Sequence, residues 1–156
     1  TSVLLAASLK LGAMLAGASK EDAENLYRYG VTVGLAFQLQ DDLLDVYGDP
    51  KVFGKKIGGD ICCNKKTFLL INALEQASPE QRREMEQWMA QEEFDADAKI
   101  KYFSSLHNTL GIRRQCEEKI ATLFAECDSY LDAVSVPAER KSVIKSFADS
   151  LLNRIH

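Results

Sequence analysis

The segment FQLQDDLLD, residues 37–45, decides how this sequence is interpreted. It places three carboxylates at the end of an apolar run, with Asp41 and Asp45 four residues apart and Asp42 and Asp45 three apart. On a helix, residues at these spacings are neighbours on one face, with Cβ atoms about 5–6 Å apart. Carboxylates that close repel each other. A divalent cation such as Mg²⁺, which prefers oxygen ligands, would offset that repulsion.

These carboxylates end a long predicted helix, from about Lys20 to Tyr47, which opens with Ser19 as a capping residue. Its second half is apolar on almost every side, which predicts a central helix surrounded by others. The helix dipole is negative at the C-terminal end, so unpaired carboxylates are disfavoured there. A solvated acidic helix end is the competing interpretation, but the apolar flanks and the helix position favour a bound metal ion.

A loop rich in glycine and lysine follows this helix. Gly48-Asp49-Pro50 ends the helix, and the lysines of the loop, among them Lys55 and Lys56, suit an anionic ligand. The loop differs from a nucleotide-binding P-loop because its glycines lie one residue too far apart and Lys56 stands where Ser or Thr is required. It also follows a predicted helix instead of a strand. A nucleotide site is therefore not expected.

Helical periodicity extends over the rest of the chain. The apolar segment 1–17 predicts a buried helix, and Gly30 and Gly34 would allow a neighbouring helix to approach the central one closely. Further helices are predicted in five places: residues 60–77, 79–92 and 95–107, and from Thr109 and Pro137 onward. No strand pattern or internal repeat is visible, so the predicted fold class is all-α, as one domain or part of one.

Composition narrows the function classes. The 156 residues are 46% hydrophobic and 27% charged, as in ordinary globular proteins, and the net charge of −4 gives no reason to expect a nucleic acid partner. No uncharged stretch approaches the roughly 20 residues of a membrane span. No signal-peptide pattern is visible, so we expect a cytoplasmic location. The four cysteines, at positions 62, 63, 116 and 127, lack the spacing of a metal site or a disulfide framework. The two histidines, His107 and His156, belong to no Ser/His/Asp grouping.

Together these residues resemble the second aspartate-rich region of the trans-isoprenyl diphosphate synthases. These are polyprenyl synthetases such as farnesyl and geranylgeranyl diphosphate synthase. The similarity is dense between residues 37 and 67. It comprises Phe37-Gln38, the DDxxD at 41–45, Gly48-Asp49, Gly54-Lys55, Gly58-x-Asp60 and Lys65-x-Thr67. Thr1-Ser2 and the helix after it also resemble the segment that follows the family's Lys-Thr motif. Less specifically, the whole chain resembles the family's C-terminal half.

The resemblance implies an all-α fold and an Mg²⁺-dependent prenyltransferase. In this family, an allylic diphosphate ionises, the double bond of isopentenyl diphosphate attacks the resulting cation, and a proton is lost. A homodimer is also implied. The resemblance gives the site residues their roles: Asp41 as main metal ligand, Asp42 and Asp45 as supporting carboxylates, Lys55 and Thr1 on the allylic diphosphate, Gln38 beside the reacting carbons, and Lys65 as a further diphosphate lysine. Asp41, Asp42 and Lys55 are the expected catalytic residues.

The sequence also departs from the family pattern. It has no first aspartate-rich motif and no Lys before Thr1. We therefore expect residues 1–156 to be the C-terminal part of a polyprenyl synthetase domain, inactive by itself. Three alternatives stay open: a non-catalytic partner subunit of a prenyl synthase, a terpene cyclase, and a plain helical domain with an acidic helix end. The intact carboxylate motif disfavours the first, and the Gly-Lys loop at 54–55 favours a synthase over a cyclase.

Overall fold

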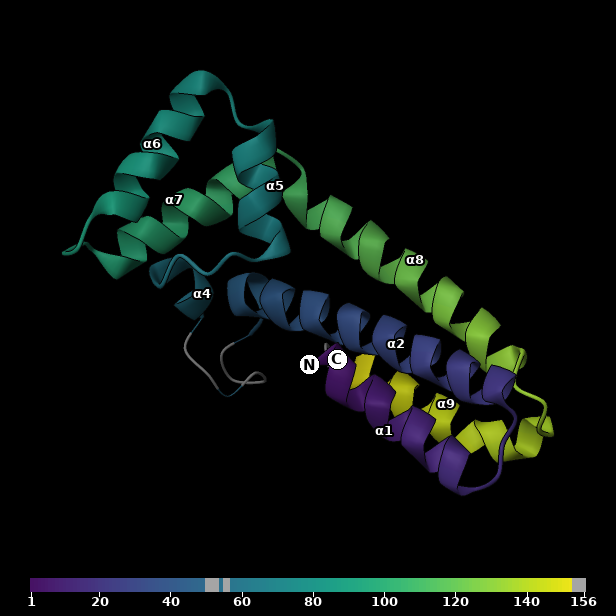
Figure 1. The fold of residues 1–156 in the computed structure, drawn as a ribbon. Coiled ribbons are helices and arrows are strands. Elements are labelled where there is room, and N and C mark those ends of the chain that lie inside the picture. Colours follow the sequence, from purple (N-terminus) through teal and green to yellow (C-terminus); the bar gives the residue numbers. More distant parts are fainter. Residues whose placement is uncertain (50–53, 55–56, 153–156) are drawn as a thin grey trace. The chain divides into compact units, whose positions relative to one another are not determined.

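The computed structural model describes residues 1–49, 54 and 57–152, and all of their regular secondary structure is helical (Figure 1). The all-α prediction is therefore confirmed. The helices are α1 (Ser2–Leu15), α2 (Lys20–Tyr47), α4 (Gly59–Cys62), α5 (Phe68–Gln76), α6 (Pro79–Ala90), α7 (Ala96–Thr109), α8 (Ile112–Asp132) and α9 (Ala138–Leu152). None of these helices is both long and apolar enough to cross a bilayer.

The chain forms two compact units. Unit 1 comprises Thr1–Gln40 and Lys119–His156, and unit 2 comprises Asp41–Glu118. Helices α2 and α8 each contribute residues to both units. The two units are described separately below.

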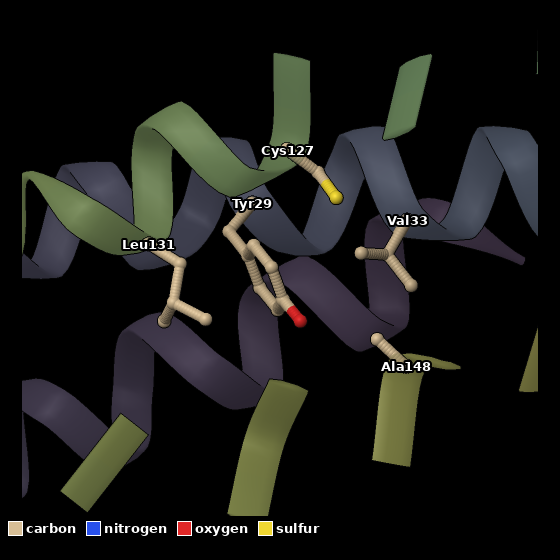
Figure 2. Close-up of a cluster of buried hydrophobic side chains, with 5 residues drawn as sticks. All are labelled: Tyr29, Val33, Cys127, Leu131 and Ala148. Carbon is tan, nitrogen blue, oxygen red and sulfur yellow. The ribbon is translucent and has the colours of Figure 1, made fainter. Parts of the chain in front are cut away.

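Unit 1 is built around an apolar cluster from α2, α8 and α9, which Figure 2 shows gathered around the ring of Tyr29. The Tyr29 hydroxyl donates a hydrogen bond to the carbonyl of Ile144 at 3.4 Å, and burial raises the pKa of Tyr29. Near the start of α2, the Asp22 carboxylate accepts a hydrogen bond from the backbone N–H of Ser135 at 2.8 Å. The cluster residues are Tyr29, Val33, Cys127, Leu131 and Ala148.

Helices α1 and α2 approach each other closely through small residues. A Cβ atom at Gly30 would lie 2.6 Å from the Ala6 Cα, and one at Gly34 would lie 2.5 Å from the Ser2 Cα. The prediction that these two glycines admit a close neighbour is confirmed. It follows that any larger side chain at either glycine would push the two backbones apart.

The prediction of a buried first helix is only partly met. Ala6 and Ala13 are buried, and Leu5 and Leu9 pack against the Tyr29 cluster. Other large apolar side chains of α1 are exposed: Val3, Leu4, Leu11, Met14 and Leu15. The physical reason is that α1 meets α2 with the face that carries Ser2, Ala6 and Leu9, whereas the exposed side chains lie away from that face.

Unit 2 contains α4, α5, α6 and α7, with parts of α2 and α8. Helix α7 packs against α4 and α5. Ser78 begins α6 with a reciprocal capping box to Gln81, close to the predicted start of this helix at residue 79, and Asp95 caps α7. The buried apolar side chains include Leu69, Leu70, Met85, Phe103, Leu106, Ile112 and Cys116.

The helix predicted over residues 60–77 is wrong in one respect, because the chain breaks it into α4 and α5. Asn64 adopts a left-handed conformation with φ of 51°, which ends the first helical turns. Thr67 then caps α5 by accepting a hydrogen bond from the Leu70 N–H. The break turns the chain between the two helices. Of the four cysteines, which form no disulfide in this structure, Cys116 and Cys127 are buried and Cys63 is exposed.

Candidate functional site

The carboxylates at the C-terminal end of α2 lie beside Lys65. The Asp42 side chain is buried, and its Oδ1 accepts a hydrogen bond from the Lys65 Nζ at 3.0 Å. The same Nζ lies 2.7 Å from the Asp60 Oδ2. We call Asp42, Asp60 and Lys65 the Lys65 cluster. Burial opposes the Lys65 charge, but the hydrogen bonds to the two carboxylates outweigh it and raise the Lys65 pKa above its ordinary value.

Asp45 anchors the chain that returns from the loop after α2. Its Oδ2 accepts a hydrogen bond from the Asp60 N–H at 2.9 Å, and its backbone carbonyl accepts one from the Gly58 N–H at 2.6 Å. Burial raises the pKa of Asp45, and the neighbouring Asp60 charge adds to the rise. Asp45 therefore fixes the start of α4, which in turn brings Asp60 to Lys65.

Asp41 differs from the other two carboxylates of the motif. It is partly exposed, and it makes no ion pair with any residue that the structure describes. Within the described ranges, no three His, Cys, Asp or Glu side chains are grouped closely enough to hold a metal ion. Asp41 supplies the oxygen donors that Mg²⁺ prefers, whereas Asp42 and Asp45 are already engaged with protein partners. Of the three predicted Mg²⁺ ligands, Asp41 therefore fits the role best. The three-residue ligand set stays a prediction.

A small cavity borders the Lys65 cluster. Its volume is about 20 Å³, enough for a water molecule, and its lining includes all three cluster residues, Thr67 and His107. His107 is 1% exposed, and neither ring nitrogen has a hydrogen-bond partner within the described part of the chain. Burial lowers the pKa of His107 to about 4, so the imidazole is neutral at physiological pH.

The remaining predicted site residues fall in other places. The Thr1 hydroxyl donates a hydrogen bond to the Gln38 Oε1 at 2.9 Å, so these two residues meet within unit 1. Lys55 lies outside the described residues. Their predicted roles toward a diphosphate stay predictions.

Sequence reasoning missed three residues that shape this site. One is Asp60, the second carboxylate that contacts Lys65 and lies five residues before it. The Gly58-x-Asp60 motif was a sequence signal that could have identified it. Asn64 and Lys99 form a part-buried hydrogen bond next to Lys65, with 2.8 Å between the Lys99 Nζ and the Asn64 Oδ1. No sequence signal identified that pair, because Lys99 stands in a segment of mixed polar and apolar residues.

Comparisons with known proteins identify the family of this chain. A family model described as polyprenyl synthetase matches residues 1–106. The chain is 31% identical over 156 residues to a geranylfarnesyl diphosphate synthase of Aeropyrum pernix, covering 99% of this chain and 48% of that protein. It is 42% identical over 85 residues to a short chain isoprenyl diphosphate synthase of Methanothermobacter thermautotrophicus, covering 54% of this chain and 26% of that protein.

Solved structures give the same likeness. A geranylgeranyl pyrophosphate synthase matches with a TM-score of 0.88 and 33% identity, over 100% of this chain and 49% of that one. A second, from Corynebacterium glutamicum and complexed with isoprenyl diphosphate and magnesium, matches with a TM-score of 0.78 and 31% identity, over 92% of this chain and 41% of that one. The chain spans about half the length, or less, of the relatives that it matches.

Proposed function

The chain belongs to the polyprenyl synthetase family, and from that premise we propose that it supplies the lysine- and aspartate-bearing part of a prenyltransferase. The proposed reaction joins an allylic diphosphate to isopentenyl diphosphate and yields a short-chain isoprenyl diphosphate. The main support is the Lys65 cluster, a cation fixed by two carboxylates, together with Asp41, which precedes Asp42 in the chain and has no ion pair among the described residues.

Lys65 is suited to bind a diphosphate oxygen. An ammonium group has three N–H donors, of which two point to Asp42 and Asp60. The Lys65 side chain is 43% exposed, so its third donor remains accessible from solvent. Its two carboxylate partners hold the charge at one place and keep it protonated, since they raise its pKa. The diphosphate would therefore meet a cation that needs little reorientation.

In this proposal Asp41 holds Mg²⁺, with Asp42 and Asp45 in supporting roles. When bound, Mg²⁺ acts as a Lewis acid that neutralises charge on the leaving diphosphate. Thr1 and Lys55 contact the same diphosphate, and Gln38 lies beside the reacting carbons. The C–O bond breaks with its electron pair on the diphosphate, the isopentenyl double bond forms the new C–C bond, and a proton is lost.

Three wider predictions belong to the same proposal. Residues 1–156 correspond to the C-terminal part of a polyprenyl synthetase domain, which is supported by the motifs between residues 37 and 67. The homodimer and the cytoplasmic location stay predictions from the sequence and its resemblance.

The test is incorporation of labelled isopentenyl diphosphate with each allylic diphosphate and Mg²⁺. It is run on the 156-residue chain and on the longest form that its gene encodes. We expect incorporation in the longer form, and product length names the synthase. Lys55→Ala should then mainly weaken use of the allylic diphosphate. No incorporation in either form overturns the proposal, and retained Mg²⁺-dependent diphosphate binding would then favour a partner subunit or a terpene cyclase.

A further inference from the structure

Lys99 is a fully buried lysine in the first turn of α7. Its relative exposure is 0%, and its Nζ donates hydrogen bonds to the Asn64 Oδ1 at 2.8 Å and the Cys62 carbonyl at 3.4 Å. The Nζ also lies 4.2 Å from the centre of the Phe94 ring. Across the described ranges, no carboxylate forms an ion pair with it. The ammonium charge is therefore balanced by neutral acceptors and an aromatic ring alone.

Asn64, the acceptor, is held from two sides. Its Oδ1 receives the Lys99 ammonium, and its Nδ2 donates a hydrogen bond to the Met89 carbonyl near the end of α6 at 3.0 Å. These contacts hold Asn64 in its left-handed conformation, which breaks the helix between α4 and α5. The side chain thus ties the turn at residues 62–65 to both α6 and α7.

Lys65 immediately follows Asn64 and depends on the same turn. Its backbone N–H donates to the Asp60 carbonyl at 2.9 Å, while its Nζ reaches the Asp42 and Asp60 side chains. A rotation of the turn would move the Lys65 Cα and withdraw the ammonium from one or both carboxylates. The geometry therefore links Lys99 to the Lys65 cluster through a single intermediate residue.

Stability alone gives a poor account of Lys99. Burial of an ammonium without an anionic partner costs free energy and lowers the pKa of Lys99. A methionine of similar length would fill the same space without the cost of burying a charge, although it would leave the Asn64 Oδ1 without its Lys99 donor. What methionine could not supply is the hydrogen bond to Asn64.

We propose that Lys99 is a positioning residue, which fixes the turn at residues 62–65 and thereby directs Lys65 toward Asp42, Asp60 and a bound diphosphate. The part that concerns diphosphate rests on the proposed function. The part that concerns Lys65 does not, and it can be tested without any ligand.

The first experiment compares Lys99→Met with Lys101→Met, a matched control on the exposed side of the same helix. Amide hydrogen exchange is measured at Cys63, Asn64 and Lys65, whose N–H groups all donate backbone hydrogen bonds. We expect about tenfold faster exchange at these amides in Lys99→Met, with an unchanged or raised melting temperature, and no change in Lys101→Met. Unchanged exchange in Lys99→Met overturns the proposal.

The second readout is the Lys65 side chain itself. Acetic anhydride labels free amines, and mass spectrometry compares Lys65 with its exposed neighbour Lys66 as internal reference. Since the cluster holds the Lys65 ammonium, Lys99→Met should raise its labelling several-fold relative to Lys66. Equal labelling in the wild type and Lys99→Met would show that Lys99 acts only on the backbone turn, and the positioning role would be lost.

A second variant keeps the test decisive if Lys99→Met does not fold. Asn64→Gly retains a residue that tolerates the left-handed conformation but removes the side chain that Lys99 holds. It should loosen the turn at least as much as Lys99→Met, because it also removes the bond to the Met89 carbonyl, and the double variant should be no looser than Asn64→Gly alone. Additive effects would overturn the proposed chain of contacts.

Titration with inorganic diphosphate and Mg²⁺ connects the inference to function. Where the wild type binds, Lys99→Met should weaken binding three- to tenfold, and Lys101→Met should not. Full binding by Lys99→Met despite a loosened turn would reduce Lys99 to a structural residue. No binding by the wild type would count against the proposed function, while exchange and labelling would still decide the role of Lys99.

Discussion

The two units of the molecule are held together by different means. Unit 1 relies on an apolar cluster around Tyr29 and on the contact of α1 with α2 through small residues. Unit 2 has an apolar core as well, and it adds polar side chains that reach across breaks in the chain, such as the bonds of Lys65 to Asp42 and of Lys99 to Asn64. This difference between the two units indicates which substitutions should affect stability and which should affect function. Substitutions in unit 1 should change folding, whereas some in unit 2 should change the site without weakening the fold.

The largest difference between the effect on activity and the effect on stability is expected at Asp41. Because Asp41 has no ion pair among the described residues, Asp41→Ala should leave the melting temperature nearly unchanged. Turnover should nevertheless fall by about a hundredfold or more if Asp41 holds the metal ion. Steady-state rates and thermal unfolding measure the two effects in the longest form of the protein. Near-normal turnover would remove Asp41 from its assigned role.

His107 should make unit 2 sensitive to acid. Its pKa is lowered to about 4 in the folded chain, against about 6.5 when unfolded, so between these values the unfolded state binds the extra proton. The stabilisation that comes from keeping His107 neutral is complete above about pH 6.5 and is lost as the pH falls. Near pH 4 the loss in the free energy of unfolding amounts to about 3 kcal/mol. Chemical denaturation from pH 7 to pH 4 should show a smaller loss in His107→Leu. Equal slopes for the two proteins would contradict the prediction.

A pair of glycines tests the close helix contact in unit 1. Gly30→Ala would place a Cβ 2.6 Å from the Ala6 backbone, so it should destabilise the protein by about 1–3 kcal/mol. Gly12→Ala, in α1, meets no atom within 4 Å and should stabilise it by up to about 1 kcal/mol through helix propensity. Urea unfolding measures both. The same sign for the two variants would show that the contact does not limit residue size.

The smallest effect is expected at the one polar contact of the unit 1 cluster. Tyr29→Phe removes the long hydrogen bond, 3.4 Å, from the hydroxyl to the Ile144 carbonyl and keeps the ring in place. The free energy of unfolding should fall by less than about 1 kcal/mol. A larger loss would mean that unit 1 depends on polar contacts as unit 2 does, and the contrast between them would weaken.

Local patterns predicted the fold well. The bounds of α2, the capping box at Ser78 and the close approach at Gly30 and Gly34 all follow from neighbouring residues or regular spacing. The break between α4 and α5 did not, because Asn64 is held by Lys99 and Met89, which are distant in sequence. The sequence likewise indicated Lys65 as a ligand contact but not its bond to Asp42, which lies 23 residues earlier in the chain. The burial of His107 also depends on tertiary packing, and periodicity alone could not indicate it.

The division of the chain has a consequence for the order of folding. Unit 2 is one continuous stretch, Asp41–Glu118, so all of its contacts are available once that stretch has left the ribosome. Unit 1 joins Thr1–Gln40 to residues that begin at Lys119, and Tyr29 cannot meet Leu131 or Ala148 until the last helices are made. The Tyr29 cluster can therefore close only after α8 and α9 have been made, later than the contacts of unit 2.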